Sequence, residues 1–214
     1  MLPTFKPNGD LPEGIHVSDW PEIETRFGKA SEHRTRAYAR LRHLYELASR
    51  TGRLARFIVF GSFVSATIAP RDIDVLLVMT ADFRLEEAPR ESRTLFSHAE
   101  AEARFSASVF WVREGMLPDQ TMQMFIETWQ TKRDGTKRRI CGGQDMIRND
   151  HELAVMRERV ASLEKVLERL RKTARPEEWA ALSSGYRLEI ERMQGEILDY
   201  LVQGAPASPA ESAV

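Results

Sequence analysis

A glycine–serine pair and an Asp-x-Asp motif lie close together in this sequence and could do chemistry jointly. Gly61-Ser62 follows the apolar run Phe57–Phe60, and Asp72-Ile73-Asp74 leads into the apolar run Ile73–Met79. Short apolar runs of this kind predict buried strands. Because residues two apart on a strand point to the same side, we expect Asp72 and Asp74 to face one site.

The chemistry that suits these residues is the binding of Mg²⁺ and a triphosphate. Two carboxylates at one spot need a cation, and Mg²⁺ takes one or two of them beside water and substrate phosphates. Gly61 would allow phosphates close to the backbone, while Ser62 could donate from its hydroxyl or from a following helix N-terminus. The alternative is a solvated turn before the strand. Against it, Asp74 lies among apolar residues and would be costly to bury without a partner.

The same residues resemble the DNA polymerase β-like nucleotidyltransferase superfamily. Its pattern is Gly-Ser or Gly-Gly after a strand, a short helix, and Asp-x-Asp on the neighbouring strand, here Gly61-Ser62 and Asp72-Ile73-Asp74. The spacing and the segment Pro70–Val75 are similar to small bacterial members. More loosely, GSFVSATIAPRDIDV with the later RDGTKRRI resembles a bacterial branch associated with prophage and toxin–antitoxin neighbourhoods. The resemblance covers about a third of the chain.

This resemblance implies Mg²⁺-dependent transfer of a nucleoside monophosphate from an NTP such as ATP to a hydroxyl of a protein, an RNA or a small molecule. Asp72 and Asp74 would be the catalytic metal ligands. Gly61 and Ser62 would seat the β- and γ-phosphates, and Ser65 and Arg71 would complete the nucleotide site. For Arg71, a surface position is an equal alternative.

The chain departs from the superfamily at the third strand, where active members add a third carboxylate that helps the metal and can act as a base. The predicted strand Phe105–Val112 contains no acid, and Ser106 or Ser108 takes the expected place. The nearest carboxylates, Glu102 and Glu114, lie outside that strand. A second hypothesis is therefore a weakly active or inactive binding protein, for example the neutralising partner of a toxin–antitoxin pair.

The elements around these motifs predict an α/β (α+β) fold, with a small mixed sheet flanked by helices. Asp19 can cap a short helix to Phe27, and Ser31 can cap an amphipathic helix towards Arg50, whose arginines we place largely off the apolar face. Further helices are expected over 89–103 and 118–130, and Asp134-Gly135 predicts a hairpin over 131–140. Together these elements form a nucleotidyltransferase-like domain over 1–147.

The last third of the chain predicts an antiparallel helical hairpin over 148–204, followed by a disordered tail over 205–214. Its first helix carries a coiled-coil seam and its second a matching apolar stripe. These residues are, for the first, Leu153, Met156, Val160, Leu163, Leu167 and Leu170, and for the second, Trp179, Leu182, Tyr186, Ile190, Met193, Ile197 and Leu201. The hairpin either covers the core of this chain or binds a protein partner or a second copy, and we favour the interaction surface.

Composition limits the remaining possibilities. The 31 basic and 32 acidic side chains give a formal net charge of −1, so bulk charge indicates no partner. A basic run at Lys132, Arg133, Lys137, Arg138 and Arg139 could contact a triphosphate or RNA, although a solvated hairpin is the favoured interpretation. The sequence has one cysteine and no apolar run long enough for a signal peptide or a membrane span, which predicts a cytoplasmic protein.

Overall fold

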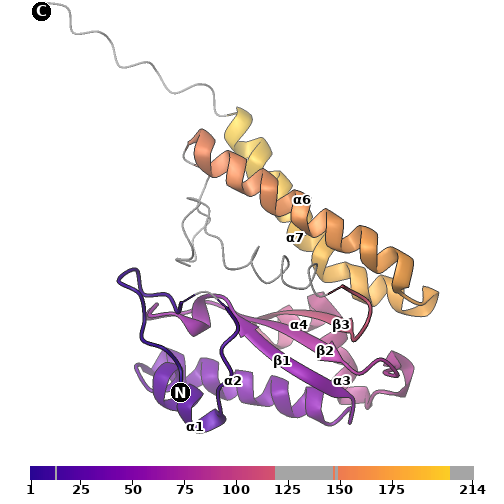
Figure 1. The fold of residues 1–214 in the computed structure, drawn as a ribbon, viewed down its shortest axis with the longest axis horizontal. Helices are drawn as coiled ribbons and strands as arrows, with labels where there is room; N and C mark the ends of the chain where they lie inside the picture. Colours follow the sequence, from indigo (N-terminus) through magenta and orange to yellow (C-terminus); the bar gives the residue numbers. More distant parts are fainter. Residues whose placement is uncertain (13, 119–146, 148, 203–214) are drawn as a thin grey trace, which may run out of the picture.

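The computed structural model describes residues 1–12, 14–118, 147 and 149–202, and it has the expected mixed α+β architecture. A three-stranded sheet lies between helices, and a pair of long helices follows it in the sequence (Figure 1). The strands are β1 (Leu54–Phe60), β2 (Ile73–Met79) and β3 (Ala107–Arg113). The helices are α1 (Trp20–Ile23), α2 (Glu32–Ser49), α3 (Arg90–Arg93), α4 (His98–Phe105), α6 (Asp150–Thr173) and α7 (Pro176–Val202).

The sheet has the order β1-β2-β3, with β1 antiparallel and β3 parallel to β2. All seven residues of β2 are buried, Asp74 among them, as expected for a central strand that is apolar except at Asp74. The prediction that β1 is wholly buried was wrong: β1 is one of the two edge strands, and only Phe60 in it is buried. It also begins at Leu54, three residues before the apolar run.

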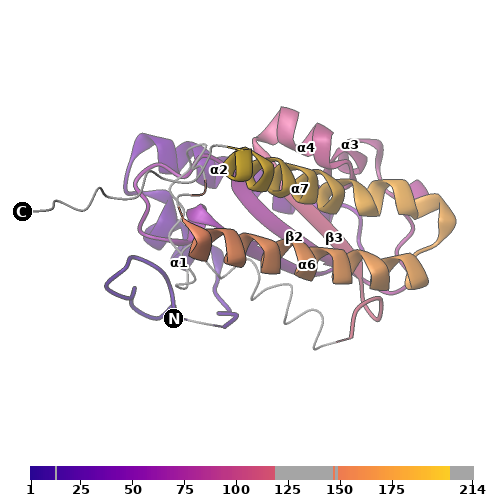
Figure 2. The ribbon, with the colours of Figure 1, turned by 90° about the horizontal axis from the view of Figure 1, so that it is seen from above.

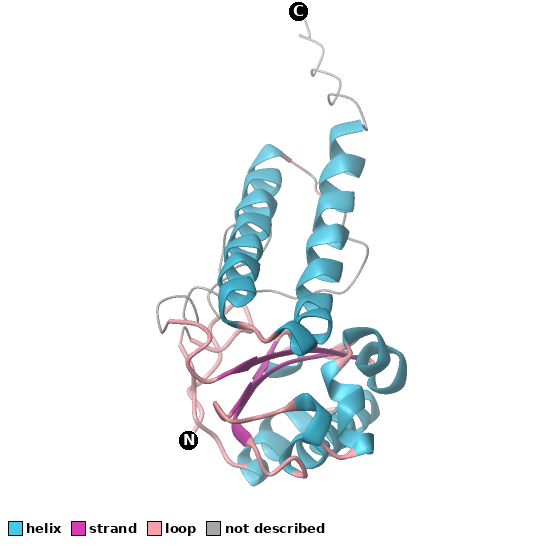
Figure 3. Cartoon of the chain, turned by 90° about the vertical axis from the view of Figure 1, so that its right-hand side faces the viewer, coloured by secondary structure: helices cyan, strands magenta, loops and turns pink. Residues whose placement is uncertain are grey.

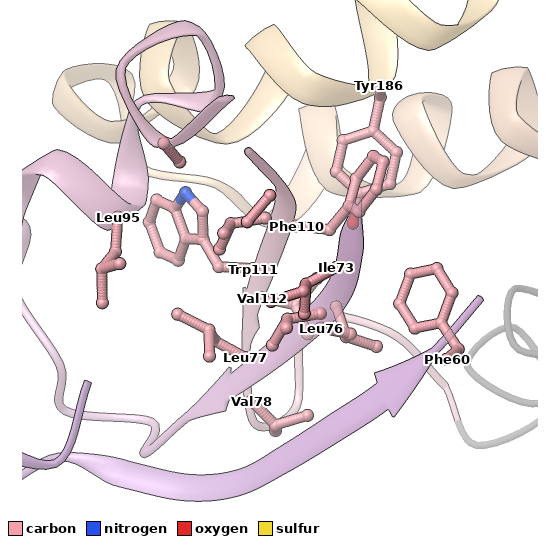
Figure 4. Close-up of a cluster of buried hydrophobic side chains, with 14 of the residues drawn as sticks. Phe60, Ile73, Leu76, Leu77, Val78, Leu95, Phe110, Trp111, Val112 and Tyr186 are labelled. Carbon is pink, nitrogen blue, oxygen red and sulfur yellow. The ribbon is translucent and has the colours of Figure 1, made fainter. Parts of the chain in front are cut away.

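The two faces of the sheet are covered by different helices (Figures 1 and 2). On one face, Phe57 of β1 contacts Tyr45 of α2, with ring centroids 5.4 Å apart. On the other face, Phe110 of β3 contacts Tyr186 of α7 at 5.3 Å, and Figure 4 shows these two rings together above the sheet. Because Asp74 pairs laterally with Phe60 and Ser108, its side chain shares the α7 face rather than the α2 face.

The helices before the sheet begin where the sequence predicts. Asp19 caps α1 by accepting a hydrogen bond from the N–H of Glu22 at 2.9 Å, and Ser31 caps α2 by accepting from the N–H of Arg34 at 3.2 Å. After α1 the chain continues as a π-helical turn over Glu24–Gly28. The single helix predicted over 89–103 is instead divided into α3, a 3₁₀ turn at Thr94–Phe96, and α4.

The predicted helical hairpin is present, and it packs on the sheet (Figure 3). Its apolar seam is buried within the chain and is continuous with the core of the sheet, with Val166 buried where we expected Leu167. Near the hairpin turn, Glu178 is 0% exposed and accepts hydrogen bonds from Arg113 and Arg175, each at 3.0 Å. This buried ion pair joins the start of α7 to the end of β3.

Several predicted elements lie outside the described residues. They include most of the 118–130 helix, the basic hairpin over 131–140 and the 205–214 tail. The division of the chain into a domain over 1–147 and a hairpin over 148–204 remains a prediction. Within the described part of the chain, no helix is long and apolar enough to cross a membrane.

Candidate active site

Gly61 and Asp74 lie in direct contact at one end of the sheet. Gly61 follows β1, and Asp74 is the second residue of β2, paired in register with Phe60. Gly61 has φ +84° and ψ −164°, a backbone conformation that is essentially confined to glycine. A Cβ at position 61 would lie only 1.7 Å from Oδ2 of Asp74. Both the backbone conformation and the lack of space for a side chain therefore require glycine at position 61. Glycine lets the carboxylate of Asp74 lie directly against the backbone.

The two serines of the glycine-serine segment have different surroundings. Ser62 begins a short 3₁₀ turn over Ser62–Val64 and is 1% exposed, and its hydroxyl has no hydrogen-bond partner among the described residues. The hydroxyl of Ser65 lies 2.8 Å from the carbonyl oxygen of Ser62 and 2.9 Å from Oγ1 of Thr67. Ser65 is thus used in holding the loop together, whereas Ser62 retains a buried donor that a ligand could satisfy.

The Asp-x-Asp motif is divided by the start of the strand. Asp74 is 7% exposed and lies within β2, whereas Asp72 is half-buried in the bend just before it. Arg71 is exposed beside them. Among the described residues, no group of three or more His, Cys, Asp or Glu side chains could hold a metal ion. Two carboxylates are within the range that Mg²⁺ uses when substrate and water supply the other ligands.

Register places Ser108 where a third carboxylate would be expected. Ser108 of β3 is the lateral partner of Asp74, and it is half-buried on the same face. Ser106 lies before the strand, at the end of α4. Glu114 follows the far end of β3, since Met79 and Arg113 form the last pair, while Glu102 is exposed on α4. Neither glutamate therefore replaces the missing acid in the strand.

Arg34 is a buried residue beside the glycine-serine loop that the sequence reasoning missed, because we placed it with the arginines that lie off the apolar face of the helix. It is 3% exposed, and its guanidinium donates to the carbonyl oxygens of four residues. The distances are 2.9 Å to Phe27, 3.0 Å to Phe63, 2.6 Å to Ser65 and 2.9 Å to Thr67.

The sequence did contain a signal for this burial. Arg34 stands three residues before Ala37, which continues with Leu41, Leu44 and Ala48 as a buried stripe of alternating three- and four-residue steps. The same spacing carried one turn further towards the N-terminus reaches Arg34. A charged residue on the apolar stripe of a helix is a candidate for a structural or functional role.

A separate cavity of about 380 Å³ lies along the free edge of β1. It is lined by Arg56–Phe60 of that strand, by Gly61 after it, and by the N-terminal arm, including Leu11, Ile15 and Val17. Gly61 and Ser65 line the cavity, whereas Asp72 and Asp74 do not. The cavity therefore adjoins the glycine-serine loop from the side of the sheet edge, apart from the carboxylates.

Comparison with known proteins gives a family for this chain. A family model described as a family of unknown function (DUF6932) matches residues 3–141. The matched range includes the sheet, the glycine-serine loop and Asp74, and it ends before α6. No curated protein and no solved structure matches the chain significantly.

Proposed function

We propose that this chain, which belongs to the family of unknown function DUF6932, catalyses the Mg²⁺-dependent transfer of a nucleoside monophosphate from an NTP to a hydroxyl group. The observation that carries the proposal is the contact between Gly61 and Asp74, which joins the two halves of the predicted motif at one end of the sheet. The buried hydroxyl of Ser62 beside them, which has no partner among the described residues, supports a ligand at this position.

In the proposed site, Asp72 and Asp74 would hold the metal, and Gly61 and Ser62 would receive the terminal phosphates. Bound Mg²⁺ would neutralise phosphate charge while the α-phosphorus is attacked. The acceptor oxygen forms a bond to the α-phosphorus, the bond to the α,β-bridging oxygen breaks, and pyrophosphate leaves. The hydroxyl proton passes to water, because Ser108 offers no carboxylate base beside Asp74.

The register of Ser108 favours a second candidate function, a protein that binds Mg-NTP but transfers slowly or not at all. Two carboxylates can hold a metal without supplying a base. In this case the protein would work through binding, as the predicted neutralising partner of a toxin would. The hairpin seam, which suggested such a partner, is buried within this chain, so the partner would bind a different surface.

The two candidates are separated by following the label from an NTP. The protein is incubated with Mg²⁺, a cell lysate and each NTP labelled at the α-phosphorus, and labelled protein and RNA are then separated. Nucleotidyl transfer deposits the α-label, and a parallel reaction with γ-label reports any phosphoryl transfer. Asp74→Asn should abolish α-label transfer, whereas Asp82→Asn, an exposed acid beyond the other end of β2, should not.

If no label is transferred, a parallel measurement of Mg-NTP binding distinguishes a binding protein from a chain without the proposed site. Mg-ATP that binds in calorimetry without any label transfer supports the binding protein. Absence of both binding and transfer with all four NTPs contradicts the proposed function in either form.

A further inference from the structure

Arg34 carries a buried positive charge with no carboxylate beside it in the described part of the chain. Its guanidinium contacts four carbonyl oxygens, and no salt bridge involves it. Burial lowers the pKa of Arg34, yet an arginine side chain stays protonated at any ordinary pH. Buried charges are normally paired with an opposite charge, because carbonyl dipoles compensate only part of the lost hydration. Positive charge is therefore left beneath the loop.

The loop above Arg34 connects the two halves of the candidate site. Three of its carbonyl oxygens, those of Phe63, Ser65 and Thr67, point to the guanidinium, and residues 63–71 link Ser62 to Asp72. The first turn of α2 makes a further contact, since Nε2 of His33 lies 2.5 Å from the carbonyl oxygen of Pro70. Arg34 and His33 of α2 thus hold the connection between the glycine-serine segment and Asp72.

The same turn places a helix N-terminus under the loop. α2 has 18 residues, and the partial positive charge of its dipole is concentrated at the end that carries Ser31 and Arg34. Ser62, which is 1% exposed and whose hydroxyl has no partner among the described residues, directly precedes the residues whose carbonyl oxygens Arg34 contacts. A buried cation, a helix N-terminus and a free buried donor together favour an anion.

We propose that Arg34 is a positioning residue of this site: it holds the 62–67 loop and supplies the fixed positive charge that an anionic triphosphate bound by Gly61 and Ser62 offsets. The inference rests on the proposed function for the location of the triphosphate. It adds that α2, which lies outside the recognised motif, sets both the shape of the loop and its preference for an anion.

Arg34→Gln and Arg34→Lys test this role by calorimetry, with Mg-ATP and with metal-free inorganic tripolyphosphate as probes. Gln removes the charge, whereas Lys keeps the charge but loses the planar set of donors. We expect Arg34→Gln to weaken the binding of both probes by about tenfold or more, corresponding to about 1.4 kcal/mol. Arg34→Lys should fall between Arg34→Gln and the wild-type protein.

The matched control is Arg113→Gln, which removes another buried guanidinium far along the sheet. It should lower the melting temperature at least as much as Arg34→Gln does, yet leave the affinity for both probes unchanged. A purely structural role for Arg34 would make the two variants behave alike. Affinity of Arg34→Gln within twofold of the wild type, or equal weakening by Arg113→Gln, would overturn the inference.

Hydrogen exchange of the wild-type protein gives a measurement that does not depend on a variant folding. Tripolyphosphate should slow amide exchange in residues 62–67 and in the first turn of α2. Protection confined to other segments would contradict the role of Arg34 even if both variants are insoluble.

The inference and the proposed function fail separately. Metal-free tripolyphosphate that binds through Arg34, without any Mg²⁺-dependent NTP binding, would refute the function and keep the inference. Mg-ATP binding that needs Asp74 but not Arg34 would do the reverse.

Discussion

Replacing Gly61 by alanine should be far more damaging than replacing Gly52 or Gly195. The new Cβ would lie 1.7 Å from Oδ2 of Asp74, so the carboxylate or the loop must move by more than about 1 Å. The backbone conformation alone costs about 1–3 kcal/mol for a residue with a side chain. Displacing the buried carboxylate of Asp74 adds about 1–3 kcal/mol. We expect the free energy of unfolding to fall by about 2–6 kcal/mol in total.

Two other glycines separate these contributions in urea unfolding. Gly52 also has a positive φ, +64°, but nothing lies within 4 Å of a Cβ there, so Gly52→Ala should cost only about 1–2 kcal/mol. Gly195 lies in α7 with open space around it, and Gly195→Ala should stabilise by about 0.5–1 kcal/mol. The difference between the first two variants reports the contact with Asp74.

A double-mutant cycle tests the contact directly. With Asp74→Ala already present, Gly61→Ala should lose its steric component, which gives a coupling energy of about 0.5–3 kcal/mol between the two positions. The reasoning is refuted if Gly61→Ala costs no more than Gly52→Ala, or if the two replacements are simply additive.

Three further predictions concern other parts of the chain. Glu178→Gln leaves Arg113 without its buried counter-ion and should cost about 3–5 kcal/mol in thermal or urea unfolding; a cost below about 1 kcal/mol would show that this ion pair is not what joins the hairpin to the sheet. Ser108→Asp should lower the melting temperature of the metal-free protein and increase the rise in melting temperature that Mg-NTP causes. Unchanged melting temperatures with and without ligand would argue against Ser108 lying beside the metal. The pKa of Glu22 is lowered from 4.5, chiefly by the N–H of Leu2 and the hydroxyl of Ser18, so its stabilising contribution is present above pH 4.5 and is lost as acid protonates the carboxylate. Limited proteolysis should therefore cut the N-terminal arm faster at low pH, and Glu22→Gln should remove that pH dependence.

The sequence predicted those parts of the fold that depend on local periodicity. The bounds of β2, the caps Asp19 and Ser31, and the two long helices follow from apolar runs and from short-range hydrogen bonds. The register that sets Ser108 beside Asp74 agrees with the expectation for the third strand. Each of these features is specified by residues close together in the chain, so a single sequence is enough to predict it.

Features that depend on the neighbours of an element were not predicted. Both β1 and β3 are edge strands, but only β1 is left largely uncovered by its neighbours, and an apolar run does not show how far other elements cover a strand. Arg34 was misplaced because charge normally indicates solvent, and its carbonyl partners lie more than 25 residues away along the loop or just before the helix. We favoured the hairpin seam as an interaction surface, whereas in the structure the seam is part of the core of this chain and α7 packs on β3.

The antiparallel pairing of β1 with β2 has a consequence for the order in which the protein can be made. Gly61 directly follows β1 and Asp74 lies in the neighbouring β2, with one short connection between them, so their contact closes a small loop and involves no residue later in the chain. The partners Arg113 and Glu178, by contrast, are 65 residues apart. On a ribosome, where chains emerge from the N-terminus, the carboxylate and its glycine can therefore meet before α7 has been synthesised. The topology thus allows this contact to form before the hairpin packs on the sheet.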